Sequence, residues 1–212
     1  MHNDRAGTVE RNQGSSSASP EASDKQIVIE RLGNHHRIAE FICCESAKST
    51  RVQDFLHRQA LTYERKNFAR IFVLSPPEDP GRVLGFYSLS AAIMSCREIS
   101  RSQQRNGPGN IDFPMVKLGY MGRSNQAKDF GKLGSIMIYD AATRVSKIDA
   151  IGVWGIILDA EIGDSQDPPN DKLVTWYAKQ GFLPLNVQQP NSGTYTMFAS
   201  LSSLLPSEEH TA

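Results

Sequence analysis

The sequence is poor in cysteine, carries no excess charge of either sign and lacks any long hydrophobic run. Its 212 residues include three cysteines, two of them adjacent at Cys43 and Cys44. An odd number without framework spacing predicts no disulfide and indicates a reducing compartment. Apolar runs such as residues 154–158 are too short to span a bilayer, and the start of the chain shows neither a secretory signal nor a transit peptide. We therefore expect a cytoplasmic protein with no membrane contact.

Charge gives no indication of a partner, because 23 basic and 23 acidic residues cancel. No global field attracts nucleic acid, although a local basic patch still can. The apolar fraction of 39% is typical of a globular domain. Near the start, however, the stretch GSSSASPEAS has too little apolar surface to offset the entropy of ordering. We expect a disordered tail over residues 1–24, one domain over residues 25–205 and a flexible C-terminus over residues 206–212.

The pattern between these ends alternates between strand and helix. Intervals of three and four predict a helix from a cap at Thr50 to about Phe68, another from 171 to 180 that Gly181 ends, and a long helix between them. The long helix begins within FGKLGS, and its apolar stripe is Leu133, Ile136, Met137, Ala141 and Val145. Runs rich in β-branched and aromatic residues predict strands at 26–32, 70–74, 83–89, 114–121, 152–158 and 194–200, with 91–99 as an extension of the sheet and 102–110 as a loop. The sum is an α+β domain, a central and mostly antiparallel sheet with helices packed on it.

A glycine-containing turn between a strand and the long helix is the first indication of chemistry. Such a turn points free backbone N–H groups and the positive end of a helix at an anion, so a phosphate-bearing cofactor is the natural expectation. Glycine content alone favours a simpler interpretation, in which Gly131 and Gly134 only let the helix approach the sheet.

The order of motifs along the chain adds a resemblance to a known family. VQDFLHRQA at 52–60, RIFVL at 70–74, FYSLSA at 86–91, Gly122-Arg123, GSIMIYDAA at 134–142 and WYAKQGF at 176–182 follow one another. Over roughly residues 27–201 this order resembles the GNAT superfamily, most closely the GNAT toxins of bacterial type II toxin-antitoxin pairs. The resemblance implies two central strands that splay apart around acetyl-coenzyme A (acetyl-CoA), with its pyrophosphate on the loop that opens the long helix.

The same resemblance implies a set of site residues. Backbone amides near Arg123 to Asn125 are expected to stabilise the oxyanion. The cofactor-binding residues are expected to be Arg123, Ser124, Asn125, Lys128, Gly131, Lys132, Gly134 and Ser135.

The loop departs from the family form Arg/Gln-x-x-Gly-x-Gly/Ala. If Gly134 takes the last place, Lys132 replaces the middle glycine and Asp129 stands first, where a carboxylate repels phosphate. The preferred register places Lys128 first and Gly131 in the middle, which leaves Leu133 where a small residue belongs.

Tyr177 matches the family tyrosine that lies near the cofactor sulfur and protonates the departing thiolate. A phenol with a pKa of about 10 can protonate a leaving thiolate of pKa near 8.5 as charge builds on sulfur. The alternative is an ordinary aromatic on a buried stripe with Leu173 and Val174. No side chain stands out as general base, and an α-amino group, with a pKa of about 7.7 to 8, needs little help to attack.

The partners expected from the resemblance are those of a toxin. They are a tRNA substrate that carries the acceptor amine, and a small antitoxin of ribbon-helix-helix type; a homodimer is left open. Arg97, Arg101 and Arg105 are spaced by four and predict a basic ridge for tRNA phosphates, with a solvated arginine-bearing loop as an equal alternative.

Two other functions stay open at this point. One is a metabolic acetyltransferase for a free small amine, and the other is a non-catalytic GNAT-fold binding module whose altered loop no longer holds acetyl-CoA. We expect no metal, because the spacing of His35, His36, Cys43 and Cys44 fits no common ligand pattern.

Overall fold

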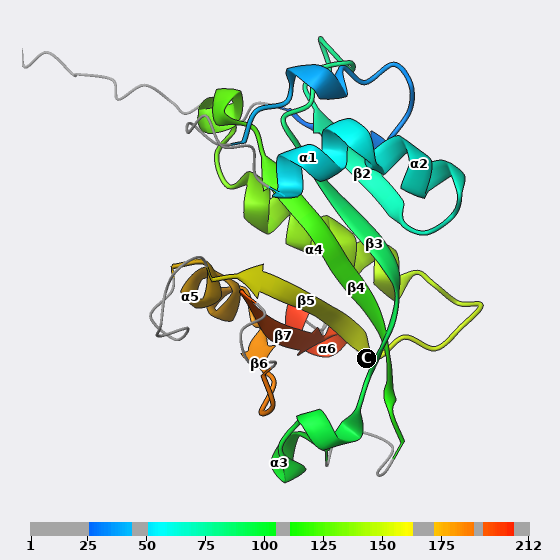
Figure 1. Ribbon diagram of the computed structural model, residues 1–212, viewed down its shortest axis with the longest axis vertical. Coiled ribbons are helices and arrows are strands. Elements are labelled where there is room, and N and C mark those ends of the chain that lie inside the picture. The colour runs from blue at the N-terminus through cyan, green and yellow to red at the C-terminus, as the bar shows by residue number, and fades with distance from the viewer. Residues whose placement is uncertain (1–25, 44–50, 105–110, 163–171, 189–192, 206–212) are drawn as a thin grey trace, which may run out of the picture.

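A seven-stranded mixed sheet forms the centre of the computed structural model, with strand order β1-β2-β3-β4-β5-β7-β6 (Figure 1). The structure describes residues 26–43, 51–104, 111–162, 172–188 and 193–205. The predicted tail and the predicted flexible C-terminus lie outside these ranges. The strands are β1 Val28–Arg31, β2 Arg70–Ser75, β3 Gly85–Met94, β4 Phe113–Arg123, β5 Gly155–Glu161, β6 Leu183–Pro184 and β7 Thr194–Ser200.

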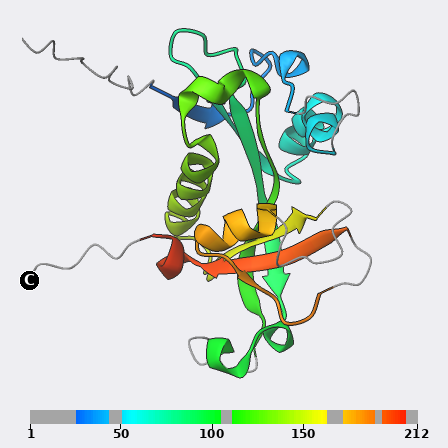
Figure 2. The same ribbon diagram turned by 90° about the vertical axis from the view of Figure 1, so that its left-hand side faces the viewer.

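Helices cover both faces of this sheet. Figure 2 shows the long helix α4 on one side of the sheet and the pair α1 and α2 on the other. The α-helices are α1 Arg51–Arg58, α2 Ala60–Arg65, α3 Arg101–Gln104, α4 Leu133–Ser146, α5 Lys172–Lys179 and α6 Leu201–Leu204, and the 3-10 turns are η1 Ile38–Glu40, η2 Cys96–Glu98 and η3 Asn125–Phe130. In the described residues no helix is long and apolar enough to cross a membrane.

The predicted stripe of the long helix is the contact surface of α4. Leu133, Met137, Ala141 and Val145 are buried in one cluster with the central strands, because residues three and four apart share a helix face. On the other face of the sheet Phe55 and Leu56 of α1 pack with Ile71, Val73 and Phe86. Each face of the central strands is therefore apolar, which explains their nearly continuous hydrophobic runs.

The predicted helix up to Phe68 was wrong in its continuity and its end. The chain breaks after Arg58, where Gln59 takes φ −120° and ψ −32°, and α2 ends at Arg65. Asn67 then has φ 63°, a left-handed conformation that ends a helix. Phe68 is 62% exposed, so no burial of its side chain favours extending the helix to this residue.

Smaller differences lie at the ends of other elements. β3 stops at Met94, since Ser95 caps the following 3-10 turn through a reciprocal capping box with Glu98. The short helix α3 lies at the start of the loop predicted for 102–110. Strand β6 and helix α6 were not predicted. Gly181 ends α5 with φ 97°, as predicted.

Strands β4 and β5 pair in parallel over only a short register. Met115 to Leu118 pair with Gly155 to Leu158. Beyond that point β4 continues along β3 to Arg123, and β5 continues along β7 to Glu161. The two central strands therefore splay apart at their carboxyl ends, and Figure 1 shows α5 beside the opening.

Candidate active site

A cavity of about 670 Å³ opens at this splay, between the end of β4, the start of α4 and α5. Arg123, Lys132 and Lys179 line it, and none of its described lining residues is acidic. A concave surface with three cations and no carboxylate attracts an anionic ligand. Its other lining residues are Met121, Gly122, Gly131, Leu133, Gly134, Ser135, Met137, Leu173, Trp176 and Gln180. We call it the cationic cavity.

The first turn of α4 presents backbone amides to this cavity. The N–H of Ile136 makes the first i to i−4 bond, to the carbonyl of Lys132 at 3.1 Å, and the N–H of Leu133 donates to Gly131 at 3.1 Å. Within the part of the chain that is described, no backbone carbonyl outside the helix accepts from the amides of Gly134 and Ser135. Helix-terminal amides in this state, with the positive end of the helix dipole, form an anion site.

The two loop positions occupied by glycine require it for different structural reasons. A Cβ on Gly134 would lie 2.8 Å from the Trp176 ring, so this glycine allows α5 to pack against the start of α4. Gly131 has φ 66° and open space around its Cα, so it serves the turn itself. Gly134 therefore allows close packing, as the simpler interpretation expected, and it also lines the cationic cavity.

Ser124 and Asn125 correct the predicted oxyanion site. The N–H of Ser124 donates to the carbonyl of Leu84 at 2.8 Å, and the N–H of Asn125 donates to Ile42 at 2.8 Å. Both amides are engaged, so the prediction that they stabilise an oxyanion was wrong. The Ser124 side chain is also occupied, because its Oγ accepts the N–H of Gln126 and caps η3. Neither residue lines the cationic cavity, and the exposed Lys128 does not line it either.

A bulge in β4 supplies other amides to the splay. The register of β3 against β4 shifts between Tyr87 and Leu89, where β4 carries one extra residue. Because Ser124 bonds to Leu84 across this ladder, alternation directs Gly122 toward β3 as well. The amides of Met121 and Arg123 therefore face the opening between β4 and β5. No motif in the sequence indicated this bulge.

A second cavity of about 240 Å³ adjoins the first, and Met121 and Leu173 line both. Tyr177 lies in this second cavity together with Lys117, Asp159 and Glu161. Its remaining lining residues are Arg51, Val52, Gly119, Tyr120 and Thr194. We call it the tyrosine cavity.

Tyr177 is both a core residue and a cavity residue. Its ring is buried, with edge contacts to Trp176 at 4.9 Å and Phe182 at 5.7 Å between centroids. Burial raises the pKa of the phenol above its ordinary value, and the nearby Glu161 carboxylate raises it further. The hydroxyl therefore holds its proton at neutral pH, which is the state that a proton donor needs.

Lys117, Asp159 and Thr196 form a polar group that was not predicted. Lys117 Nζ lies 2.6 Å from Asp159 Oδ2, and Thr196 Oγ1 donates to Asp159 Oδ1 at 2.7 Å. Burial alone raises the pKa of Asp159, but these two hydrogen bonds outweigh it and the pKa lies below its ordinary value. A possible signal was the DAE ending of an apolar strand, which places Asp159 and Glu161 on one face. Lys117, however, reaches Asp159 only through the β4–β5 pairing.

The two described arginines of the predicted ridge lie away from both cavities. Arg97 and Arg101 are exposed and follow the end of β3, and Arg105 lies outside the described residues. Figure 1 places α3 at the opposite end of the sheet from the start of α4. A role for these arginines in binding RNA stays a prediction.

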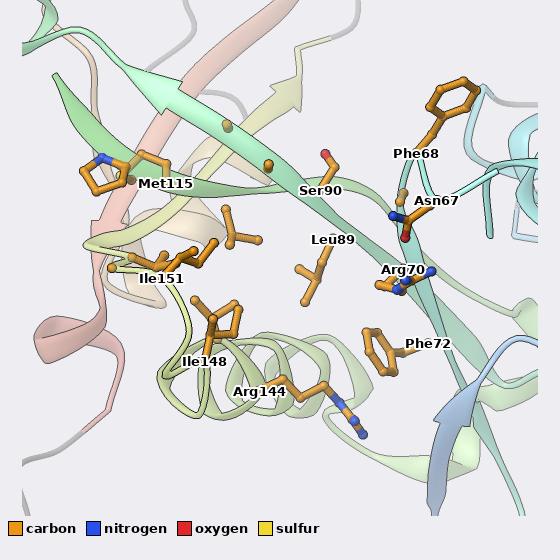
Figure 3. Close-up of a pocket in the computed structure, with 18 residues that line it drawn as sticks. Asn67, Phe68, Arg70, Phe72, Leu89, Ser90, Met115, Arg144, Ile148 and Ile151 are labelled. Carbon is orange, nitrogen blue, oxygen red and sulfur yellow. The ribbon is translucent and has the colours of Figure 1, made fainter. Parts of the chain in front are cut away.

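A third cavity, of about 450 Å³, holds none of the predicted residues. Figure 3 shows its apolar floor, with Leu89, Met115 and Ile148 in the groove and Arg144 beside Phe72 at one end. It lies against the C-terminal half of α4, so the cofactor loop does not contribute to it.

Comparisons with known proteins agree with this architecture. No protein-family model matches the chain. A protein of Sinorhizobium fredii (strain NBRC 101917 / NGR234) described as a probable toxin TacT is 28% identical over 164 residues, which cover 76% of this chain and 86% of the relative. A solved structure of AtaT complexed with acetyl-methionyl-tRNAfMet superimposes with a TM-score of 0.67 at 24% identity, over 84% of this chain and 97% of AtaT. The chain has the GNAT fold.

A further GNAT-fold structure carries an antitoxin. It is a mutant of the toxin AtaT bound to the C-terminus of the antitoxin AtaR and acetyl-CoA, with a TM-score of 0.61 at 22% identity over 84% of this chain and 95% of the other. The predicted α+β fold and the resemblance to GNAT toxins are thus confirmed.

Proposed function

We propose that this protein is an acetyl-CoA-dependent N-acetyltransferase. The observation that carries the proposal is the pair of adjoining cavities at the β4–β5 splay. One is cationic and contains the amides at the start of α4, and the other contains the proton-bearing phenol of Tyr177. Diphosphate on the first and an acceptor amine in the second would bring the thioester to the shared wall of Met121 and Leu173. The structure of AtaT with acetyl-CoA and antitoxin supports this cofactor.

The reaction forms one bond and breaks one. The neutral amine nitrogen attacks the thioester carbonyl carbon, and a C–N bond forms as the C–S bond breaks. The N–H groups of Met121 and Arg123 face the opening and are suited to stabilise the carbonyl oxygen as it becomes negative. Tyr177 donates its proton to the departing sulfur, the amine loses a proton to solvent, and the phenolate then takes a proton back from solvent.

Glu161 gives the tyrosine cavity its acceptor preference. Its carboxylate stands at the end of β5, close enough to Tyr177 to raise the pKa of the phenol. Asp159 is paired with Lys117, whereas Glu161 forms no ion pair with any residue in the described ranges. It is suited to attract a protonated amine, whose α-amino form, with a pKa of about 7.7 to 8, then deprotonates readily at working pH.

The acceptor that we favour is the amino group of an aminoacyl-tRNA, which makes the protein a toxin with a cognate antitoxin. AtaT with acetyl-methionyl-tRNAfMet and the probable toxin TacT support this choice. A free small amine is the alternative acceptor. The two are separated by mass spectrometry of acetylated products after incubation with cell extract.

Calorimetry and turnover with acetyl-CoA test the enzymatic proposal. The full chain should bind acetyl-CoA, and Tyr177→Phe should keep this binding while kcat falls by about 10²- to 10⁴-fold, the usual contribution of a general acid. Tyr139→Phe is the control, because Tyr139 is 59% exposed on α4. Lys179→Glu should weaken binding, whereas Lys172→Glu on the same helix lies off the cavity and should not.

Two outcomes would overturn this reading. A folded protein that neither binds nor turns over acetyl-CoA would leave a non-catalytic binding module. A protein that acetylates a free amine and can be expressed without growth arrest would remove the toxin assignment and keep the enzyme.

A further inference from the structure

Glu30, His35 and His36 converge on one point, away from both cavities of the proposed reaction. Glu30 lies in β1, and the two histidines lie in the turn that follows it. Glu30 Oε1 is 2.9 Å from His35 Nε2 and 3.3 Å from His36 Nε2. One ligand atom from each residue lies within 4.8 Å of the other two. We call these three residues the histidine–glutamate cluster.

His36 is the unusual member of the cluster. Its side chain is fully buried, at 0% exposure. Its Nε2 atom has no hydrogen-bond partner of adequate geometry, although it faces the Glu30 carboxylate. A buried polar atom in this state loses its hydration without replacement, and such atoms in folded proteins call for an explanation.

The other ring nitrogen of His36 indicates what Nε2 could do. His36 Nδ1 lies 3.2 Å from the carbonyl oxygen of Gly33, and in the other tautomer it accepts the Gly33 N–H, whose nitrogen is 3.0 Å away. In the tautomer whose Nδ1–H donates to that carbonyl, Nε2 presents a lone pair to a carboxylate oxygen. Two lone pairs at 3.3 Å repel each other unless a proton or a metal ion lies between them, and the pair lacks the geometry of a hydrogen bond through a proton.

We propose that the histidine–glutamate cluster binds a divalent transition-metal ion of the zinc type. Two imidazole nitrogens and one carboxylate oxygen are a common three-residue ligand set for zinc, and they leave a fourth position for water or an external ligand. A histidine that ligates through one nitrogen usually donates its other N–H to a carbonyl or carboxylate, as His36 can to Gly33.

The surrounding backbone holds the cluster in place before any ion arrives. A Cβ on Gly33 would lie 2.9 Å from His35 Nδ1, so a larger residue at this position would displace the His35 ring. The next residue, Arg37, donates its N–H to Gly81 at 2.8 Å and its guanidinium to Asp79 at 2.6 Å.

Bound metal would brace the segment that leads from β1 to the active site. Residues 37–43 follow the cluster directly, and the Ile42 carbonyl in this segment accepts the N–H of Asn125 at the end of β4. The ion would act by holding this segment in place, because the cluster residues line neither the cationic nor the tyrosine cavity.

Calorimetric titration of the untagged, metal-free full chain with ZnCl₂ at neutral pH tests the proposal. We expect one ion per chain at the cluster and a rise in thermal unfolding temperature, with Mg²⁺ giving neither. His35→Asn and Glu30→Gln should each weaken zinc binding at least about tenfold, because loss of a direct ligand costs no less than loss of an outer-shell partner. Both side chains are partly exposed, at 53% and 39%, so these variants should fold even if a His36 variant does not.

Controls exclude other donors in the chain. His57→Asn removes a histidine outside the cluster, and Cys43→Ser with Cys44→Ser removes the adjacent thiols; zinc binding should survive both changes. The proposal is overturned if the wild type takes up no zinc, or if His35→Asn and Glu30→Gln bind it as the wild type does. These results do not depend on acetyl transfer, so they leave the proposed function untouched.

Discussion

At the scale of single residues, one side chain often serves both packing and chemistry. Tyr177 packs against Trp176 and Phe182 in the core, and its ring also lines a cavity. Gly134 lies on the cationic cavity and under the Trp176 ring. From the sequence, packing and a role in the site were alternatives for both residues. In the structure both hold, because the walls of a cavity are themselves closely packed.

Gly134→Ala tests the contact between α4 and α5. Alanine favours a helix over glycine by roughly 0.5–1 kcal/mol, but its Cβ would lie 2.8 Å from the Trp176 ring. Overpacking of this kind typically costs about 1–3 kcal/mol. We expect a net loss of stability in urea unfolding, and weaker acetyl-CoA binding.

Gly152→Ala is the matched control, because nothing lies within 4 Å of a Cβ built there. It should leave both measurements close to those of the wild type. Equal behaviour of the two variants would show that the Trp176 contact does not constrain Gly134.

At the scale of elements, a polar cluster joins α4 to β3. The hydroxyl of the fully buried Tyr87 donates to Asp140 on α4. Arg144 Nε lies 2.7 Å from Asp140 Oδ2 and 3.1 Å from the Tyr87 hydroxyl, and its guanidinium stacks 4.1 Å above the Phe72 ring. Burial and the Asp140 carboxylate raise the pKa of Tyr87, so the phenol stays protonated.

Tyr87→Phe should therefore lower the free energy of unfolding by about 1.5–3 kcal/mol, the usual contribution of a hydrogen bond to a charged group. Tyr139 on α4 is exposed and supplies the comparison. Tyr139→Phe should keep the free energy of unfolding within about 0.5 kcal/mol of the wild type. Chemical denaturation measures both. A Tyr87→Phe variant as stable as Tyr139→Phe would mean that Arg144 alone satisfies Asp140.

At the scale of the whole molecule, the β4–β5 pairing connects the two halves of the sheet. Lys117 on β4 and Asp159 on β5 form an ion pair at this junction, and Thr196 of β7 supports it. Because the folded protein holds the pKa of Asp159 below its ordinary value, the unfolded chain binds a proton more readily. The stabilisation is thus complete above the unfolded pKa of about 3.9 and is lost as pH falls through the folded pKa.

Asp159→Asn should separate the contribution of the Asp159 charge from the other causes of lost stability at low pH. At pH 7 the variant should be less stable than the wild type in urea unfolding. The difference should shrink as the pH is lowered past 4, because the wild-type carboxylate then takes up its proton. A stability difference that does not change with pH would assign the loss to packing instead of charge.

Local patterns were enough to predict most elements. Periodicity located α4 and its buried stripe, β-branched runs located six strands, and Gly181 marked the end of α5. These features depend on neighbours in the chain, so the sequence carries them directly. The break at Gln59 was missed because helical periodicity continues across it to Ala60, which is buried like its predecessors Phe55 and Leu56.

The sequence by itself determined the fold class and the elements that bear the site, including the turn ahead of α4 and the helix that carries Tyr177. Tertiary structure decided the rest: the splay of β4 from β5, the bulge that turns the Met121 and Arg123 amides outward, the engagement of Ser124 and Asn125, and the pairing of Lys117 with Asp159. The reason is physical. Each of these depends on which strand lies beside which and in what register. Such contacts join residues that are tens of positions apart, so no pattern among neighbours in the sequence reveals them.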